Sequence, residues 1–299
     1  FMTDTFDWIV VKNELIWKKI IEETATSVLV EVGAGENRDA FVRWTIDQWR
    51  WWVENLVSIP GTVGAAPVQN IGAYGVEAKQ TITAVHCIDL KEWTTHIFDN
   101  DWCNFGYRDS LFKSSEYEHF FISAVRFRLE KIHNKYTYNV NYEWVEDKTK
   151  QLQTEYPLQS SLRCIATAIA SIRATKLPDR KTIGTAWSFF QNPVISTTQF
   201  EMLKETYPTL KWRPTTHWIK LSAWQLIELA WLKWYTKNNV GVYDHHALVL
   251  VNYGNPQWSA LQEIINHIIE KTKDLFHVTL IPEVRCFPSW IHMHHKINK

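Results

Sequence analysis

One short run, IPGTVGAAPVQNIGAYGVE at residues 59–77, constrains this chain more than any other part of its sequence. The chain has only ten glycines in 299 residues, and four of them fall in this run. Glycine tolerates left-handed backbone and lets the main chain approach another group closely. The run therefore predicts a ligand-binding loop, with a tight structural turn as the alternative reading.

The residues between these glycines are mostly small, and Gln69, Asn70 and Tyr74 add side-chain donors and acceptors. The run lacks the spacing and the strand-to-helix context of a dinucleotide fingerprint or a phosphate-binding loop. Composition alone is thus a weak indication of which ligand the loop binds.

The overall composition favours a globular, cytoplasmic protein of two domains that acts on a small molecule. Hydrophobic residues make up 45% of the chain, and 32 basic residues balance 32 acidic ones, which indicates neither a nucleic-acid partner nor a membrane partner. The four cysteines lack metal-ligand spacing and fit reduced thiols. We expect no metal site and no transmembrane segment.

Strand and helix patterns alternate along the chain and predict an α+β fold. Strands are expected at residues 27–32, 82–90, 95–98, 120–129, 247–252 and 278–286, and helices at 38–55, 160–175, 198–206, 221–233 and 256–275. Asn37 is the expected N-cap of the first helix. The sequence LPD at 177–179 ends a helix and marks the expected domain boundary.

The glycine-rich run resembles, nearly residue for residue, the flavin loop of the UDP-N-acetylenolpyruvoylglucosamine reductases, the MurB family. Further family-like words follow in the same order and span most of the chain. These are VLVEVGAGEN at 28–37, FGYRDS at 105–110, TKLPD at 175–179, SFFQNP at 188–193, ALVLVN at 247–252 and PEVR at 282–285.

This resemblance implies an α+β fold, with an FAD-binding domain of the MurB/vanillyl-alcohol-oxidase-like superfamily and a smaller α+β substrate domain. It assigns residues 1–178, completed by 278–299, to FAD binding and residues 179–277 to the UDP-sugar. It further implies the E. coli-like subclass. Family members carry about sixty more residues before the segment where this chain starts, the size of a small subdomain, so we expect the FAD-binding domain to be N-terminally incomplete.

The family reduces UDP-N-acetylenolpyruvoylglucosamine to UDP-N-acetylmuramate for peptidoglycan synthesis, with NADPH and bound FAD. That reaction needs a hydride donor, a proton donor and stabilisation of a developing enolate. The resemblance implies Ser188 as the proton donor, with Glu283 and Arg108 completing the catalytic site. Arginine is a permanently charged donor suited to an enolate.

The resemblance also implies binding residues for both ligands. Those for the cofactor are Gly61, Thr62, Gly64, Ala65, Ala66, Gln69, Asn70, Ile71, Gly72, Ala73, Tyr74, Gly75 and Arg285. Those for the substrate are Tyr142, Lys176, Asn192, Lys233 and His246. We expect a monomer whose partner is the small UDP-sugar, with no nucleic acid and no membrane.

Tryptophan is unusually abundant, with 17 residues. It stands where the family has glycine at Trp8, Trp52, Trp187, Trp224 and Trp234. In KEWT at residues 91–94 it occupies a turn between β-rich segments, where a residue that tolerates positive φ is expected. Gln191 stands where the family commonly has lysine.

Two alternative functions remain open from the sequence. One is a nucleotide-sugar-binding remnant without redox activity, which the expected loss of the N-terminal part and Trp187 would favour. The other is a different FAD-dependent oxidoreductase of the same superfamily.

Overall fold

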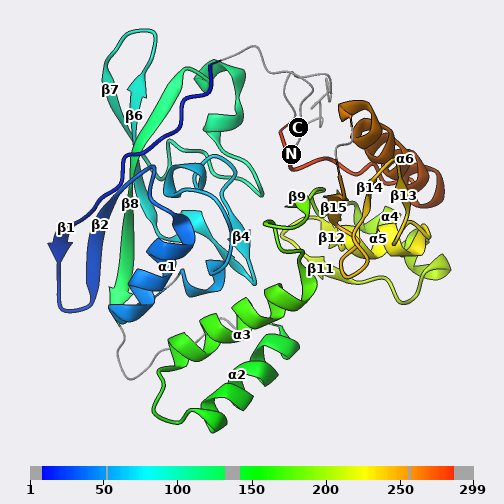
Figure 1. The fold of residues 1–299 in the computed structure, drawn as a ribbon, viewed down its shortest axis with the longest axis horizontal. Coiled ribbons are helices and arrows are strands. Elements are labelled where there is room, and N and C mark those ends of the chain that lie inside the picture. The colour runs from blue at the N-terminus through cyan, green and yellow to red at the C-terminus, as the bar shows by residue number, and fades with distance from the viewer. Residues whose placement is uncertain (1–8, 52, 132–141, 255–256, 286–299) are drawn as a thin grey trace. The chain divides into compact units, whose positions relative to one another are not determined.

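The computed structural model describes residues 9–51, 53–131, 142–254 and 257–285 of the chain. They form two compact units, Ile9–Arg173 and residues 174–285 (Figure 1). We call these the first and the second unit. The boundary lies a few residues before the one expected after residue 178.

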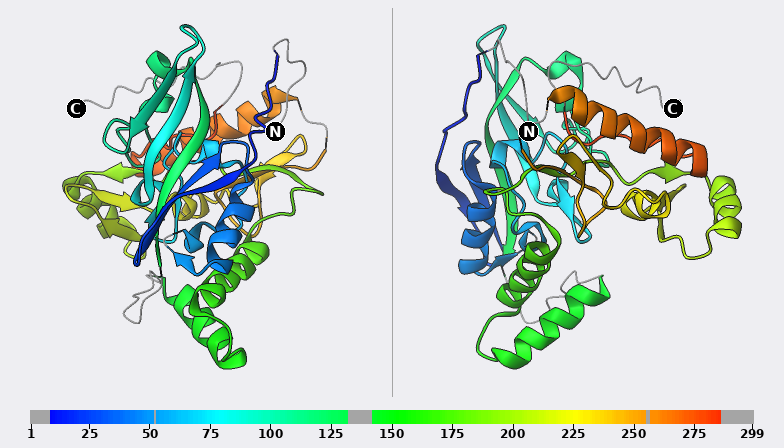
Figure 2. Two further views of the ribbon diagram at one scale, coloured as in Figure 1. Left: turned by 90° about the vertical axis from the view of Figure 1, so that its left-hand side faces the viewer. Right: turned by 45° about the vertical axis from the view of Figure 1, so that its right-hand side comes forward.

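The first unit contains a twisted antiparallel sheet with strand order β1-β2-β8-β6-β7, and a short β3 also pairs with β8 (Figure 2). Its strands are β1 (Lys18–Glu23), β2 (Ser27–Gly33), β3 (Arg50–Trp51), β6 (Ile82–Asp89), β7 (Thr95–Asp99) and β8 (Phe120–Lys131). In β2 the buried residues alternate with partly exposed ones, as expected for a strand with one face on the core. A separate two-stranded sheet pairs β4 (Gly72–Ala73) with β5 (Val76–Glu77).

Helix α1 (Arg38–Asp47) follows β2 and begins at the N-cap that the sequence predicted. The Asn37 side chain accepts a hydrogen bond from the Ala40 amide at 2.9 Å. The helix ends at the C-cap Gln48 rather than at residue 55, because Trp49 has a left-handed backbone with φ 56°.

Two further helices complete the first unit, α2 (Glu143–Glu155) and α3 (Ser161–Lys176), the last three residues of which belong to the second unit. The sequence predicted α3 but not α2. Short 3-10 helices connect the other elements: η1 (Glu54–Leu56), η2 (Val63–Ala65), η3 (Ala78–Gln80), η4 (Leu111–Lys113) and η5 (Ser115–Tyr117).

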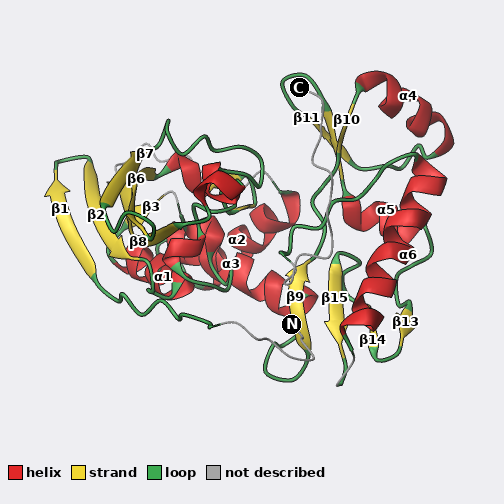
Figure 3. Ribbon diagram, turned by 90° about the horizontal axis from the view of Figure 1, so that it is seen from above, coloured by secondary structure: helices red, strands yellow, loops and turns green. Residues whose placement is uncertain are grey.

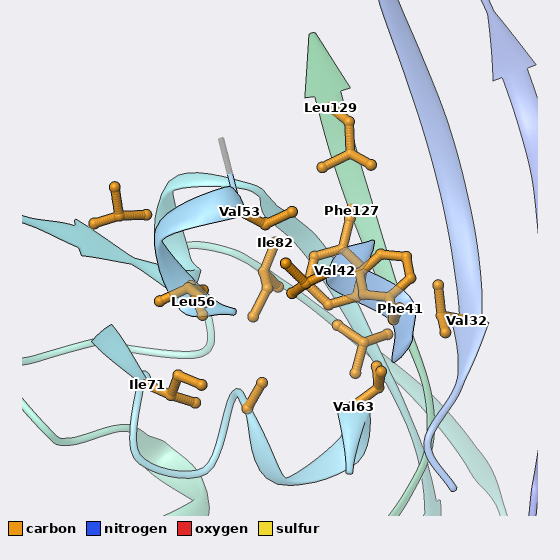
Figure 4. Close-up of a cluster of buried hydrophobic side chains, with 14 of the residues drawn as sticks. Val32, Phe41, Val42, Val53, Leu56, Val63, Ile71, Ile82, Phe127 and Leu129 are labelled. Atoms are coloured by element: carbon orange, nitrogen blue, oxygen red, sulfur yellow. The ribbon is translucent and has the colours of Figure 1, made fainter. Parts of the chain in front are cut away.

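The core of the first unit lies between α1, the sheet and the glycine-rich run (Figure 4). Phe41 of α1 packs against Phe127 of β8, with ring centroids 5.0 Å apart. Val63 and Ile71, from the glycine-rich run, are buried in the same cluster. The run is therefore fixed to the scaffold through its own apolar residues.

Two buried thiols in the first unit give a prediction about alkylation. Burial raises the pKa of Cys87 and of Cys103 to about 12. An unfolded thiol ionises near pH 8.5, so the folded chain should keep these thiols neutral, and they should disfavour the folded state as pH rises above that value. At about pH 9, iodoacetamide should label both residues far more slowly in native protein than in denatured protein. Equal labelling rates in peptide maps would contradict this.

The second unit contains a four-stranded sheet of order β13-β14-β15-β9 and a three-stranded sheet of order β10-β12-β11, both antiparallel. Helix α6 (Trp258–Phe276) runs beside β14 (Figure 3). The other elements are β9 (Gly184–Ser188), β10 (Val194–Ile195), α4 (Thr197–Thr206), β11 (Trp212–Pro214), β12 (Ile219–Leu221), α5 (Ala223–Leu229), β13 (Thr236–Lys237), β14 (Val240–Val242) and β15 (Val249–Asn252).

Residues 278–285 pack with the second unit, whereas the sequence assigned them to the first. Their backbone follows residues 189–191: the Gln191 amide donates to the Ile281 carbonyl at 2.9 Å, and Phe190 forms an isolated bridge with Pro282. A single bridge is not a strand, so the strand predicted for this segment is absent between residues 278 and 285. In the parts of the chain that the structure describes, none of the helices is both long and apolar enough to cross a bilayer.

Candidate active site

The glycine-rich run is anchored to the turn that joins β2 to α1. The Val63 amide donates to the Glu36 carbonyl and the Gly64 amide to the Ala34 carbonyl, both at 2.9 Å. The Arg38 amide donates in return to the Gly61 carbonyl at 3.1 Å. Two segments with family-like sequences, 28–37 and 59–77, thus form one structural element.

Glycine is required at the four positions of the run for two different structural reasons. Gly61 and Gly75 have positive φ, at 115° and 84°, a conformation that L side chains rarely adopt. Gly64 and Gly72 instead lie tight against the protein: a Cβ on Gly64 would be 2.5 Å from the Ala34 Cβ, and one on Gly72 would be 2.7 Å from the Val76 carbonyl oxygen. At these two positions the close approach predicted from the sequence is to the protein itself.

Gly64→Ala should therefore destabilise the protein. The new methyl group would clash with the Ala34 Cβ and backbone, and the close-packed interior around them cannot easily move to make room. Overpacking of this kind costs about 1–3 kcal/mol in the free energy of unfolding. Gly106→Ala is the matched control, since its Cβ would meet only the Asp109 Cβ at 3.3 Å. Urea unfolding of both variants tests the prediction, and equal midpoints would contradict it.

Asn70 holds the run together from inside. Its side chain is fully buried and makes three hydrogen bonds. The Nδ2 atom donates to Glu77 Oε2 and to the Gly106 carbonyl, both at 2.9 Å, and Oδ1 accepts from the Lys79 amide at 3.0 Å. Asn70 was predicted to bind the cofactor. In the structure its side chain holds the glycine-rich run in place through these three bonds.

The other residues predicted to bind FAD differ in how much of them is accessible. Gly61, Ala65, Gly75 and Arg285 are exposed, and Thr62, Gln69, Gly72, Ala73 and Tyr74 are partly exposed. Gly64, Ala66 and Ile71 are buried, the last two in the hydrophobic core. The accessible members of the first unit all lie in the glycine-rich run, and Arg285 belongs to the second unit.

Two arginines that the sequence reading missed lie beside the run. Arg38 is 6% exposed, donates to the Pro60 carbonyl, and leaves its Nε without a hydrogen-bond partner among the described residues. Burial, reinforced by the nearby charge of Arg173, lowers the pKa of Arg38 to about 10. A signal was present in the sequence, because Arg38 shares the inward helical face of Phe41, Val42 and Thr45.

Arg173 interacts with Tyr74 of the run. Burial lowers the pKa of the Arg173 guanidinium, and Tyr74 raises it in part through a side-chain hydrogen bond. One buried cation, Arg38, and one partly buried cation, Arg173, therefore lie next to the glycine-rich run. Positive charge beside an accessible loop suits a ligand with negative groups, such as the pyrophosphate of FAD. The residues present thus fit the cofactor that the sequence predicted.

Arg108, the residue expected to stabilise the enolate, contacts the same run. Its Nη2 donates to the Gly72 carbonyl at 2.5 Å, and its own carbonyl accepts from Lys113 Nζ at 3.0 Å. Arg108 has a left-handed backbone with φ 54°, a strained conformation for arginine that often marks functional segments. The structure thereby brings Arg108 to the predicted flavin loop.

Tyr142, expected to close over the nucleotide, also reaches the glycine-rich run. Its ring lies edge-on to Tyr74 with centroids 5.7 Å apart, and Trp144 contacts both rings. Tyr142 comes directly before α2, where its carbonyl accepts from the Val145 and Glu146 amides and its side chain does not cap the helix. Three aromatic rings from two distant segments therefore meet at Tyr74.

In the second unit, the segments that carry Ser188 and Glu283 lie side by side. Ser188 ends β9 with an exposed side chain and pairs in register with Val249. The Glu283 amide donates to the carbonyl of Phe189, the next residue, at 2.7 Å. Phe189 and Phe190 are both 1% exposed, so the backbone that carries Ser188 is fixed by two buried aromatic anchors.

The remaining predicted substrate residues lie in the second unit. Asn192 Oδ1 accepts from the Ala223 amide at 2.9 Å and so satisfies the start of α5. Lys233 Nζ lies 2.8 Å from Glu228 Oε1, and His246 Nδ1 accepts from the Leu248 amide at 3.2 Å.

Lys176 differs from these three because the charge near it is positive. Burial lowers its pKa, and the nearby Lys211 lowers it further. Lysine is a compact cation suited to phosphate, and Lys211, which was not predicted from the sequence, adds a second positive charge in this region.

Comparisons with known proteins identify the family of the chain. A family model described as UDP-N-acetylenolpyruvoylglucosamine reductase, C-terminal domain, matches residues 178–287, and one described as FAD binding domain matches residues 2–94. The UDP-N-acetylenolpyruvoylglucosamine reductase of Flavobacterium johnsoniae is 38% identical over 276 residues, which cover 92% of this chain and 80% of the relative. The enzyme of that name from Pseudomonas aeruginosa is 39% identical over 270 residues, which cover 89% of this chain and 77% of the relative.

A solved structure has the same fold. The crystal structure of UDP-N-acetylenolpyruvylglucosamine reductase (MurB) from Thermus caldophilus matches with a TM-score of 0.58 at 21% identity, covering 86% of this chain and 72% of that one. The two-unit α+β fold and the FAD-binding domain place the protein among FAD-dependent oxidoreductases. The chain belongs to the UDP-N-acetylenolpyruvoylglucosamine reductase family. This confirms the family, the fold class and the cofactor FAD that the sequence predicted.

Proposed function

We propose that the protein reduces UDP-N-acetylenolpyruvoylglucosamine to UDP-N-acetylmuramate, with NADPH as the reductant, in peptidoglycan precursor synthesis. The observation that carries the proposal is the backbone hydrogen bond from Glu283 to Phe189, which joins the two segments that hold the predicted proton donor and its carboxylate partner. Family membership at 38–39% identity supports the same substrate.

Within this proposal FAD, when bound, supplies the two-electron chemistry that moves a hydride from NADPH to the substrate alkene. The hydride adds to one carbon of the double bond, and Ser188 Oγ gives a proton to the other carbon. The double bond thereby gains two hydrogens. Glu283 orients Ser188 or its proton supply. Arg108 stabilises the negative charge that develops on the substrate carboxylate as the enolate forms.

Binding residues are assigned on the same basis. The accessible part of the glycine-rich run, together with Arg38 and Arg173, holds FAD. Lys176 and Lys233 provide positive charge for the substrate diphosphate. Asn192 and His246 contact the UDP-sugar, and Tyr142 closes over the nucleotide as in the E. coli-like subclass.

The proposal is tested with purified protein, FAD, NADPH and the enolpyruvyl sugar nucleotide. The expected result is flavin absorbance together with NADPH oxidation that depends on the sugar nucleotide. Calorimetry with UDP-N-acetylglucosamine, with and without FAD, addresses the non-redox alternative. An FAD-loaded protein that binds the sugar nucleotide but leaves NADPH unoxidised would refute the reductase proposal.

We further propose that the enzyme acts as a monomer in the cytoplasm. Its proposed substrate and NADPH are highly charged small molecules of that compartment. The balanced charge of the chain, 32 basic and 32 acidic residues, offers no attraction to nucleic acid or to an anionic membrane. Light scattering during size exclusion should give the mass of one chain, and a dimer mass would contradict the oligomeric part of the proposal.

A further inference from the structure

Five tryptophans in the described chain have a left-handed backbone. These five left-handed tryptophans are Trp49 (φ 56°), Trp93 (55°), Trp187 (62°), Trp231 (60°) and Trp234 (66°). Thirteen non-glycine residues in the described part of the chain have positive φ, and four of them are asparagine, which tolerates this conformation. A bulky aromatic residue does not, so five tryptophans in one chain need a common cause.

Trp231 shows the pattern most clearly, because it follows helix α5 in a complete Schellman motif. Its amide donates to the Glu228 carbonyl at 3.0 Å, and the Leu232 amide donates to the Ile227 carbonyl at 3.1 Å. The residue at this position after a helix is usually glycine, since glycine has no Cβ to oppose the left-handed turn. Trp49 occupies the corresponding position after α1, where its amide donates to the Ile46 carbonyl at 3.0 Å.

Trp93 lies in the hairpin between β6 and β7, at the position for which the sequence predicted a residue tolerant of positive φ. Its amide donates to the Asp89 carbonyl at 2.8 Å, and the Asp89 amide donates to the Thr94 carbonyl at 2.8 Å. Turns that close hairpins in this way favour glycine at the left-handed position. Trp187 and Trp234 are positions where the family resemblance independently expects glycine.

Four of the five indole rings gain little from packing. Trp231 is 91% exposed, Trp93 77%, Trp234 66% and Trp49 60%. Trp44 and Trp258 differ, since they lie in helices and pack against the two hydrophobic cores. Trp44 and Trp258 are thus placed as tryptophan usually is, whereas the five left-handed tryptophans are placed as glycine usually is.

We infer that the five left-handed tryptophans are glycine in the protein that the cell makes. A codon that one genetic code reads as tryptophan and another reads as glycine would convert many scattered glycines at once, which independent point mutations would not. UGA is such a codon, and UGG would specify the tryptophans that pack in the cores. Trp8 and Trp52, which also replace family glycines, lie outside the described residues, and Trp224 has helical backbone within α5.

The inference changes the surroundings of Ser188. Trp187 directly precedes it, and the Arg180 guanidinium lies 5.3 Å from the centre of the Trp187 ring. Glycine at 187 would remove the indole from beside the serine and free Arg180 from that contact. This consequence rests on the proposed function of Ser188, whereas the inference about glycine does not.

Peptide mass spectrometry of the protein isolated from its own cells tests the inference directly. Peptides that contain positions 49, 93, 187, 231 and 234 should have the mass of glycine, and those with Trp44 and Trp258 the mass of tryptophan. Tryptophan at the five positions overturns the inference. Peptide masses do not depend on activity, so a glycine-containing protein without reductase activity would refute the proposed function alone.

A second measurement compares recombinant single variants with their parent chain, all made from unambiguous codons. Each of Trp49→Gly, Trp93→Gly, Trp231→Gly and Trp234→Gly should raise the melting temperature by about 2–4 °C, because it removes left-handed strain without losing buried area. Trp44→Gly and Trp258→Gly are the controls and should lower it. A chain that is more stable with tryptophan at the exposed left-handed positions contradicts the inference.

Discussion

Ser188→Ala should lower kcat for reduction of the enolpyruvyl sugar nucleotide by about 10²–10⁴-fold, the usual contribution of a general acid. The exposed side chain of Ser188 has little to lose in packing, so the melting temperature should stay close to that of the parent protein. Reduction of bound flavin by NADPH should also be unaffected, because that half of the reaction needs no proton on the substrate. Stopped-flow flavin absorbance and steady-state NADPH oxidation measure the two halves separately.

Ser196→Ala is the matched control in the same unit. Ser196 Oγ accepts a hydrogen bond from the Gln199 amide at 3.2 Å and caps helix α4. Its loss should cost about 0.5–2 kcal/mol in the free energy of unfolding and leave kcat unchanged. The two substitutions should therefore affect different quantities: Ser188→Ala should lower kcat, and Ser196→Ala should lower stability. A Ser188→Ala enzyme with the parent kcat would exclude Ser188 as the proton donor.

Secondary structure was predictable wherever an element buries one regular face. The strand expected at 120–129 and the helix expected at 256–275 both formed, as β8 and α6, because their apolar residues recur with periods of two and of three to four. Helix α2 was missed because only Val145, Thr149 and Leu152 are buried along its thirteen residues. Strand β1 was also missed, since all six of its residues are exposed and it exists through pairing with β2.

Element ends depended on single residues with unusual backbone. The helix expected at 38–55 continues in apolar spacing past Asp47, yet the chain turns at Trp49. Helix α5 likewise stops at Leu229, short of the expected residue 233, because Trp231 is left-handed. If both positions carry glycine in the cell, the sequence would have predicted these ends by the ordinary rule for helix termination.

In the candidate site, several residues could be predicted from local sequence, but the contacts between distant segments could not. The glycine-rich run could be found from the sequence because its residues are contiguous, and the family resemblance supplied Ser188, Glu283 and Arg108. The approach of Glu283 to Phe189, and of Arg108 to Gly72, comes from long-range pairing that no spacing rule predicts. Arg38 was overlooked because an arginine in the first turn of a helix normally faces solvent.

Asn70→Ala should be the most destabilising single change in the glycine-rich run. Alanine would leave Glu77, the Gly106 carbonyl and the Lys79 amide without the partners that Asn70 provides. Each buried group left without a partner costs about 1–3 kcal/mol. Asn70 also has φ 42°, a conformation that asparagine tolerates better than alanine does. We expect a total loss of about 3–5 kcal/mol in the free energy of unfolding, together with weaker binding of FAD.

Asn266→Ala provides the comparison, because Asn266 is exposed on helix α6. There the same substitution should change the free energy of unfolding by less than about 0.5 kcal/mol. Urea unfolding gives the two stabilities, and flavin fluorescence titration gives the affinity for FAD. Because the Asn70 side chain is fully buried and is bonded to Glu77, Gly106 and Lys79, the loss of FAD affinity should follow the loss of loop order rather than a missing ligand contact. Unchanged stability with a large loss of FAD affinity would instead show that Asn70 contacts the cofactor directly, as the sequence first suggested.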